Sequence, residues 1–323
     1  MADHDTIVLS LTILYVITMI VALAGNTLLI YIVFRKPGTR NMTSFLFVNM
    51  AVADLMVAVF QMPVSITHFY VFGSSDFVAY FNCRFLYYAV YVSTIASIFC
   101  LTVMAFDRYF AVVHPFRQSI WFRKPKIITP IIWISSMALM SIVPVAFKLG
   151  HDKCEMDRSL YLPFHAYFFA VGFLLPLAVI SVLYTLVARK LWLHEVPVDH
   201  NQQEPEIPKK KVIRMLIIVV VVFAVCWLPV HIYQVLDSVT IAIGDPLNWG
   251  HYVIIYICYW FSHANSAINP WLYILLNGKM KSALKKMIGR RYEELAGREQ
   301  LTLTTTRNSR ANYSKNSESE TRL

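Results

Sequence analysis

The chain has 323 residues, of which 57% are hydrophobic and only 15% are charged, and its mean hydropathy is +0.54. Soluble globular proteins are about 45–50% apolar and about 25% charged, and a soluble core of this size could not bury the excess apolar surface. The composition therefore argues against a soluble or disordered chain and indicates a membrane protein. The net charge of +10 would suggest nucleic-acid binding in a soluble protein. In a membrane protein, basic residues also mark the cytoplasmic loops, so their positions along the chain matter.

Seven stretches contain no Asp, Glu, Lys or Arg and are long enough to cross a bilayer core, which takes about 20 helical residues. They are 7–34, 55–75 (extended backwards by 41–53, with only Asp54 between), 85–106, 127–147, 159–188, 215–236 and 246–277. The first stretch lacks the basic start of a signal peptide and is too long for one. No sequence period relates the stretches. The sequence predicts an all-α membrane protein with a seven-transmembrane helix bundle over residues 7–277.

The basic residues alternate with the predicted spans. Of the 29 Lys and Arg residues, 25 follow spans one, three, five and seven. Cytoplasmic loops carry the Lys and Arg excess, so we expect a multi-pass plasma-membrane protein with its N-terminus outside and its C-terminus inside. The outer face then carries −4 and the inner face +15. Topology and attraction to anionic lipid explain the inner charge, and no nucleic-acid partner is expected.

Asp54 is the clearest ionisable residue at membrane depth, where a charge is costly unless it is compensated. We expect an ion-binding or switch role for it, ahead of a purely structural hydrogen bond. Polar residues of the third span recur at three-and-four spacing and end in Arg108, which Asp107 can pair. Three later spans contain an internal proline, at Pro176, Pro229 and Pro270. Such breaks in a bundle suggest that it changes shape.

Only two of the five cysteines, Cys83 and Cys154, lie near the outer surface, which faces the oxidising compartment. We therefore predict a Cys83–Cys154 disulfide that ties the loop after the fourth span to the top of the third. Cys100, Cys226 and Cys258 fall within spans and behave as small apolar residues.

Ordered motifs on the seven spans resemble those of the rhodopsin-like (class A) G-protein-coupled receptors. In chain order they are Gly25-Asn26, 49–55, Cys83, Asp107-Arg108-Tyr109, Trp133, Pro176 with Tyr184, Phe223 with 226–229, and 269–273. One such motif would carry little weight, but the ordered set is specific and covers residues 7–288. The resemblance implies a receptor, not an enzyme, which passes an extracellular signal to a heterotrimeric G protein.

The resemblance also implies roles for individual residues. No cofactor is expected apart from an allosteric sodium ion, held by Asp54, Ser97, Asn265 and Asn269. The activation switch would comprise Asp107, Arg108, Tyr109, Tyr184, Phe223, Trp227, Pro229, Pro270 and Tyr273. The G protein would contact Arg108, Pro115, Phe116, Lys210 and Lys211.

The chain departs from many relatives at the start of the sixth span, where an acidic residue commonly pairs with the arginine of the third span. Three lysines, 209–211, stand in that region instead. We therefore predict that Arg108 relies on Asp107 alone, which would raise basal activity.

The resemblance argues against two ligand classes. Amine receptors carry an Asp where Val90 stands, and visual pigments carry a retinal-binding Lys where His263 stands. The segments 41–55, 81–115 and 226–237 look like those of tachykinin, galanin, allatostatin and RFamide-type receptors, which favours a short basic or amidated neuropeptide. The expected ligand contacts are Tyr87, Val90, Tyr91, Thr94, Tyr233, Asp237, Tyr259, Trp260 and His263. Asp237 is the expected partner of a peptide Arg or of an amidated end.

Two alternatives stay open. A receptor of the same fold could bind a small molecule or a lipid, although the charged loop 151–158 weighs against a closed apolar outer surface. A transporter or channel is the remote alternative, since transporters often show internal repeats.

The segments outside the predicted bundle are a short N-terminus, an amphipathic segment and a polar C-terminal tail. Residues 1–6 form a brief extracellular N-terminus, and 278–290 alternate apolar and Lys residues as an amphipathic helix on the inner leaflet does. Residues 291–323 are rich in Ser and Thr, which predicts a disordered cytoplasmic tail that binds arrestin when phosphorylated. The last four residues resemble a ligand of a PDZ-domain scaffold, in which Thr321 and Leu323 enter the pockets.

Overall fold

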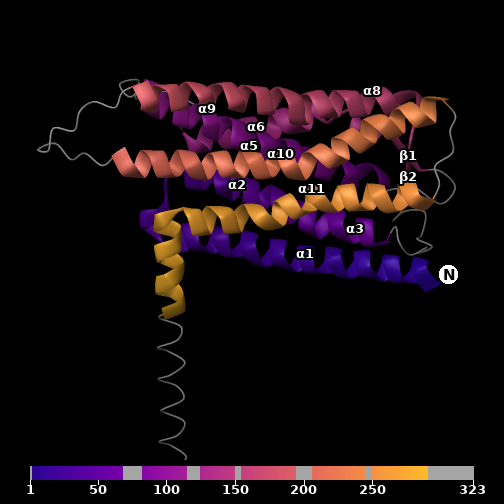
Figure 1. The fold of residues 1–323 in the computed structure, drawn as a ribbon, viewed down its shortest axis with the longest axis horizontal. Coiled ribbons are helices and arrows are strands. Elements are labelled where there is room, and N and C mark those ends of the chain that lie inside the picture. The colour runs from indigo at the N-terminus through magenta and orange to yellow at the C-terminus, as the bar shows by residue number, and fades with distance from the viewer. Residues whose placement is uncertain are drawn as a thin grey trace, which may run out of the picture.

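The computed structural model describes residues 2–67, 82–114, 124–149, 154–193, 206–243 and 249–289. Its long helices run side by side along one axis (Figure 1). In chain order the runs are α1 (Ala2–Arg35), α2 (Met42–Met56) with α3 (Met62–Thr67), α5 (Tyr87–Val113), α6 (Pro125–Leu139) with α7 (Val143–Ala146), α8 (Arg158–Phe169) with α9 (Leu175–Leu193), α10 (Glu206–Ile243) and α11 (Trp249–Leu276). These seven runs form the predicted helical bundle.

Six of the runs in the described residues are long and apolar enough to cross a membrane. The seventh, α11, has sufficient length, but buried polar residues lower its mean hydropathy: His263, Asn265, Ser266 and Asn269. It packs between α1, α2 and α10, so these polar groups face protein instead of lipid.

The second span includes the predicted backward extension. Its helical run is continuous over 42–66, with Asp54 in the middle, and 68–75 lie outside the described residues. Asn41 caps the start of α2, because its Oδ1 accepts a hydrogen bond from the Ser44 amide at 2.9 Å. The first helix also begins earlier than predicted, at Ala2, so most of 1–6 continues α1.

Prolines alter two helices in a way that the sequence did not specify. The π-helical turns Val57–Gln61 and Ala170–Leu174 come shortly before Pro63 and Pro176. Proline has no N–H and its ring clashes with the preceding turn, and a widened turn accommodates both effects. Pro229 and Pro270 lie inside α10 and α11.

A short hairpin connects α7 to α8. Its strands, β1 (Phe147–Leu149) and β2 (Cys154–Met156), pair antiparallel with Leu149 opposite Cys154. The predicted Cys83–Cys154 disulfide is confirmed, with a Cα–Cα distance of 5.1 Å. The hairpin itself was not predicted, because strands of three residues are too short to show an alternating pattern.

Close contacts hold the first and seventh spans together. A Cβ atom at Gly25 would lie 2.7 Å from the Trp271 indole nitrogen and 2.8 Å from Pro270 Cγ. Glycine is therefore required there for the two helices to approach. Asn26 of the same motif donates to the Ser266 carbonyl at 3.0 Å.

After α11 the chain turns sharply into a last helix, residues 278–289, which lies across the end of the bundle (Figure 1). The Asn277 side chain caps it by accepting from the Lys279 amide at 3.1 Å. Met280 and Ala283 are buried against the bundle, while the lysines on the other faces are exposed. This arrangement agrees with the predicted amphipathic helix over its described part.

Candidate functional site

A cavity of about 340 Å³ lies at the hairpin end of the bundle, between α5, α8, α10, α11 and the α2–α3 run. Six of the nine predicted ligand contacts line it: Tyr87, Val90, Tyr91, Thr94, Tyr259 and His263. Cys154 of the hairpin also lines it, so the disulfide holds one of its walls in place. Most of the predicted ligand contacts therefore share one cavity, and their role in ligand binding stays a prediction.

The other three predicted contacts do not line this cavity. Trp260 points toward α1, where its indole N–H donates to Thr18 Oγ1 at 2.8 Å. The Asp237 carboxylate is buried and accepts from the Tyr161 hydroxyl at 3.0 Å. Tyr233 is half-buried on a neighbouring face of α10. These three residues therefore lie off the cavity wall. Tyr233 and Trp260 are sequence neighbours of the lining residues Gln234 and Tyr259 and so point about 100° away from them, whereas Asp237 lies one turn beyond Gln234 on the same stripe. Their role as ligand contacts stays a prediction.

Several lining residues were missed from the sequence. The polar ones are Gln61, Ser65, Tyr161, Gln234, Tyr256 and Ser262. A signal was present on α10, where Trp227, Val230 and Gln234 recur at three-and-four spacing. Extending this stripe from Trp227 would have selected Gln234 before Asp237, which lies on the same stripe one turn further on, and would have left out Tyr233.

A second polar centre surrounds Asp54, which is 2% exposed. Its carboxylate accepts from Ser266 Oγ at 2.8 Å and from Asn269 Nδ2 at 3.3 Å. Ser266 was missed, although it lies one turn before the predicted Asn269. Ser97 and Asn265 are buried, but in the described structure neither donates to Asp54.

The donor set around Asp54 fits a hard cation. The side-chain oxygens of Asn265 and Asn269 are buried and have no hydrogen-bond partner among the described residues. Carboxylate, amide and hydroxyl oxygens are the ligands that such cations prefer. Two neutral donors are weak compensation for a buried carboxylate, so a cation here would satisfy both the charge and the free amide oxygens.

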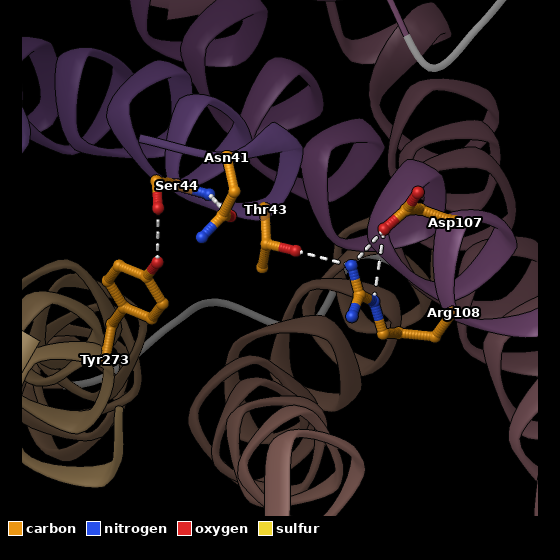
Figure 2. Close-up of polar contacts among 6 residues, drawn as sticks. All are labelled: Asn41, Thr43, Ser44, Asp107, Arg108 and Tyr273. Atoms are coloured by element: carbon orange, nitrogen blue, oxygen red, sulfur yellow. Dashed lines mark hydrogen bonds and ion pairs between the residues drawn. The ribbon is translucent and has the colours of Figure 1, made fainter. Parts of the chain in front are cut away.

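At the opposite end, Arg108 of α5 is held by two partners (Figure 2). Its guanidinium forms an ion pair with Asp107, and it donates to Thr43 Oγ1 at 2.8 Å. The prediction that Arg108 relies on Asp107 alone was wrong, because the first turn of α2 brings the Thr43 hydroxyl within reach. The side chains of 209–211 lie outside the described structure.

The same turn of α2 holds Tyr273 of α11 (Figure 2). The Tyr273 hydroxyl is 2.8 Å from Ser44 Oγ, and its ring stacks on Phe47 with centroids 3.8 Å apart. Ser44 Oγ also donates to the Thr39 carbonyl, so Tyr273 is the donor to Ser44. One helical turn that Asn41 caps therefore holds residues of both α5 and α11.

Aromatic rings connect the cavity with the bundle interior. Trp227 lines the cavity, and its ring centroid is 6.2 Å from that of Phe223 and 6.4 Å from that of Phe168. Phe223 lies 5.8 Å from Phe173 on the π-helical turn of the fifth span. A group that displaced Trp227 would therefore disturb α8 and α10 together.

Other predicted switch and interface residues have the following positions. Tyr184 is buried on α9, and the Tyr109 hydroxyl is 3.3 Å from His114 Nε2. Lys210 and Lys211 lie in α10, and their side chains are outside the part of the chain that the structure describes. The remaining predicted contacts, Pro115, Phe116, Thr321 and Leu323, are outside the described residues.

Comparison with known proteins agrees with this architecture. The profile of the family described as "7 transmembrane receptor (rhodopsin family)" matches residues 25–273. The somatostatin receptor type 2 of Mus musculus is 33% identical over 298 residues, which cover 86% of this chain and 76% of that receptor. The allatostatin-A receptor of Bombyx mori is 32% identical over 307 residues, which cover 88% of this chain and 82% of that receptor. The substance-P receptor of Aquarana catesbeiana is 28% identical over 291 residues, which cover 84% of this chain and 68% of that receptor.

The matched region contains all seven helical runs, apart from residues 2–24 of α1 and the last three residues of α11, as well as the disulfide, the Asp54 centre and the Arg108 contacts. The relatives are signalling receptors and not enzymes. The chain therefore belongs to the rhodopsin family of seven-transmembrane receptors.

Proposed function

We propose that the chain is a plasma-membrane receptor that binds an extracellular peptide in the described cavity and activates a heterotrimeric G protein. The observation that carries the proposal is the position of Trp227, which lines the cavity and neighbours Phe223 in the bundle interior. Three relatives are named as receptors for somatostatin, allatostatin-A and substance P, which are peptides. Binding would shift the population between two bundle shapes.

The proposed orientation has the hairpin end outside. The N-terminal end of α1 and the disulfide-linked hairpin lie at the same end of the bundle, and helix 278–289 lies at the other (Figure 1). Disulfides persist in oxidising compartments, and basic residues concentrate on the cytoplasmic side. Both arguments favour the same assignment.

The Asp54 centre is proposed to bind an allosteric sodium ion. Asp54 would supply the charge, and the free amide oxygens of Asn265 and Asn269 would supply further ligands. A bound sodium ion would provide the counter-charge for the carboxylate. Its loss would then accompany a rearrangement of α2 against α11.

Further partners are proposed on sequence grounds. Phosphorylated Ser and Thr residues of 291–323 would bind arrestin. Thr321 and Leu323 would enter the pockets of a PDZ domain. The exposed lysines of helix 278–289 would lie on the anionic inner leaflet.

The proposal is tested by expressing the full chain with a panel of G-protein activation sensors. The cells are challenged with a neuropeptide library, biogenic amines and lipids. We expect responses to peptides alone, and their loss in Trp227→Ala at unchanged surface expression. A receptor that responded to amines or lipids and to no peptide would contradict the proposal.

A further inference from the structure

The described wall of the cavity carries no formal charge. Among the lining residues that the structure describes there is no Asp, Glu, Lys or Arg. Two described acids of α10 and of the start of α8 have partners: Asp237 accepts from Tyr161, and Asp157 pairs with Lys148 at 2.8 Å. The Lys148 hydrogen bond lowers the pKa of Asp157 to about 2, so this carboxylate stays ionised and paired. A charged ligand group would therefore find no counter-ion among the described lining residues, which is unfavourable.

Two polar atoms of the cavity wall have no hydrogen-bond partner among the described residues, Gln234 Oε1 and His263 Nδ1. Their side chains are only 4% and 5% exposed, and both residues line the cavity. Leaving such atoms unpaired is costly, so a ligand that pairs with them gains affinity and specificity.

The two residues are linked through Tyr259. Gln234 Nε2 donates to the Tyr259 hydroxyl at 3.2 Å, and the Tyr259 ring is nearly parallel to that of His263, with centroids 6.5 Å apart. Gln234 is thereby held with its oxygen free, on the wall where α10 meets α11. The wall offers one acceptor and one imidazole nitrogen on neighbouring side chains.

We infer that this wall binds a neutral primary carboxamide, such as the amidated C-terminus of a peptide. Gln234 Oε1 accepts from the ligand N–H, and His263 Nδ1–H donates to the ligand oxygen. A free carboxylate offers no N–H to Gln234 and brings a charge that none of the described lining residues neutralises. The inference rests on the proposed peptide-receptor function, and it gives Gln234 the role that the sequence suggested for Asp237.

Other rings that line the cavity suit an apolar side chain of the peptide next to its C-terminal carboxamide. Tyr91 and Phe168 both line the cavity, and their rings meet edge to face at 4.9 Å. They offer an apolar surface for the side chain next to the carboxamide. The recognised class is therefore an uncharged amidated end with an apolar neighbour.

The test is affinity selection on the purified full-length receptor. Two pools of N-acetylated tetrapeptides contain the same sequences and differ only in the C-terminus, which is a carboxamide in one and a carboxylate in the other. We expect amides to be retained at least about tenfold over their matched acids. Gln234→Leu and His263→Phe should each bring this ratio close to one.

Matched variants control for folding and for the competing assignment. Gln234→Glu keeps an acceptor oxygen and should keep or raise the amide-to-acid ratio, even if Gln234→Leu fails to fold. Asp237→Asn should leave the ratio unchanged. The inference would be overturned if the wild type retained acids and amides equally. It would also be overturned if the amide-to-acid ratio were unchanged in both Gln234→Leu and His263→Phe. A third contradicting result is the selection of Lys- and Arg-ended peptides that Asp237→Asn abolishes.

The experiment separates this inference from the function on which it rests. Peptides that bind and activate the receptor without an amide preference would overturn the inference and leave the proposed function standing. If no peptide of either pool binds while amines or lipids activate the receptor, both fail.

Discussion

Two of the predicted switch residues, Arg108 and Tyr273, have identified partners on α2. Arg108 and Tyr273 lie on different helices, yet Thr43 and Ser44, neighbours on α2, hold both of them. The sequence lacks the acid that often pairs with the arginine, and Thr43 occupies part of that role. A neutral hydroxyl holds a guanidinium less strongly than a carboxylate does, so the equilibrium between bundle shapes should be easy to shift.

Removing the Thr43 hydroxyl should raise basal activity. In Thr43→Val the side-chain shape is kept, but the hydroxyl that accepts from Arg108 is lost, which leaves Asp107 as the remaining described partner of Arg108. The bond is partly exposed, so we expect a shift of about 1 kcal/mol and roughly a fivefold increase in ligand-free nucleotide exchange. Thr102→Val is the matched control, because Thr102 donates only within its own helix, to the Ile98 carbonyl at 3.0 Å. Basal exchange equal to that of the wild type would contradict the holding role of Thr43.

The Asp54 centre predicts a stability that depends on sodium. A cation that binds only the folded receptor raises its midpoint of unfolding, and at ten times its Kd the shift is about 2 °C for a chain of this size. We expect NaCl to stabilise the wild type relative to KCl at equal ionic strength, and Asp54→Asn to abolish the difference. Asp157→Asn, which changes an acid outside the spans, should retain it. An equal effect of the two salts on the wild type would argue against the ion.

At the scale of elements, apolar content was sufficient to predict seven spans, and compartment arguments were sufficient for the disulfide. The second span could be extended across Asp54 from the sequence, but the partner that makes Asp54 tolerable there, Ser266 of α11, could not be predicted before folding. The π-helical turns and the hairpin were not predictable in form. They depend on where the prolines meet neighbouring helices and on the pairing of two three-residue strands.

The hairpin should control ligand binding through its disulfide. In Cys83→Ser/Cys154→Ser, β2 loses its attachment to the third span, and Cys154 no longer fixes the cavity wall. Disulfides contribute about 2–4 kcal/mol to folding, so we expect a lower midpoint of unfolding together with at least tenfold weaker peptide binding. Cys258→Ser, at a half-buried free cysteine, is the control that should change neither quantity. Unchanged peptide affinity in the double variant would show that the hairpin is not part of the binding wall.

At the scale of the whole molecule, the cavity and the α2 contacts lie at opposite ends of one bundle. The sequence identified the inward stripe of α5 correctly, because its polar residues stand out among apolar ones. On α10 it selected Asp237 over Gln234, since a charge is more conspicuous in sequence than a neutral amide whose oxygen has no partner. Burial and missing partners, which reveal Gln234, exist only after folding.

Coupling between the two ends gives the last prediction. If the ligand and the G protein both favour the same bundle shape, a variant that populates this shape must also bind the agonist more tightly. The gain in agonist affinity cannot exceed the factor by which the population of this shape rises. Thr43→Val should therefore raise the affinity of the tightest amidated peptide by up to about fivefold, although Thr43 does not line the cavity. The measurement is equilibrium binding to purified receptor without G protein, with Thr102→Val beside it. Raised basal exchange with unchanged peptide affinity would mean that the α2 contacts act on the G-protein face alone and not on a shape shared with the cavity.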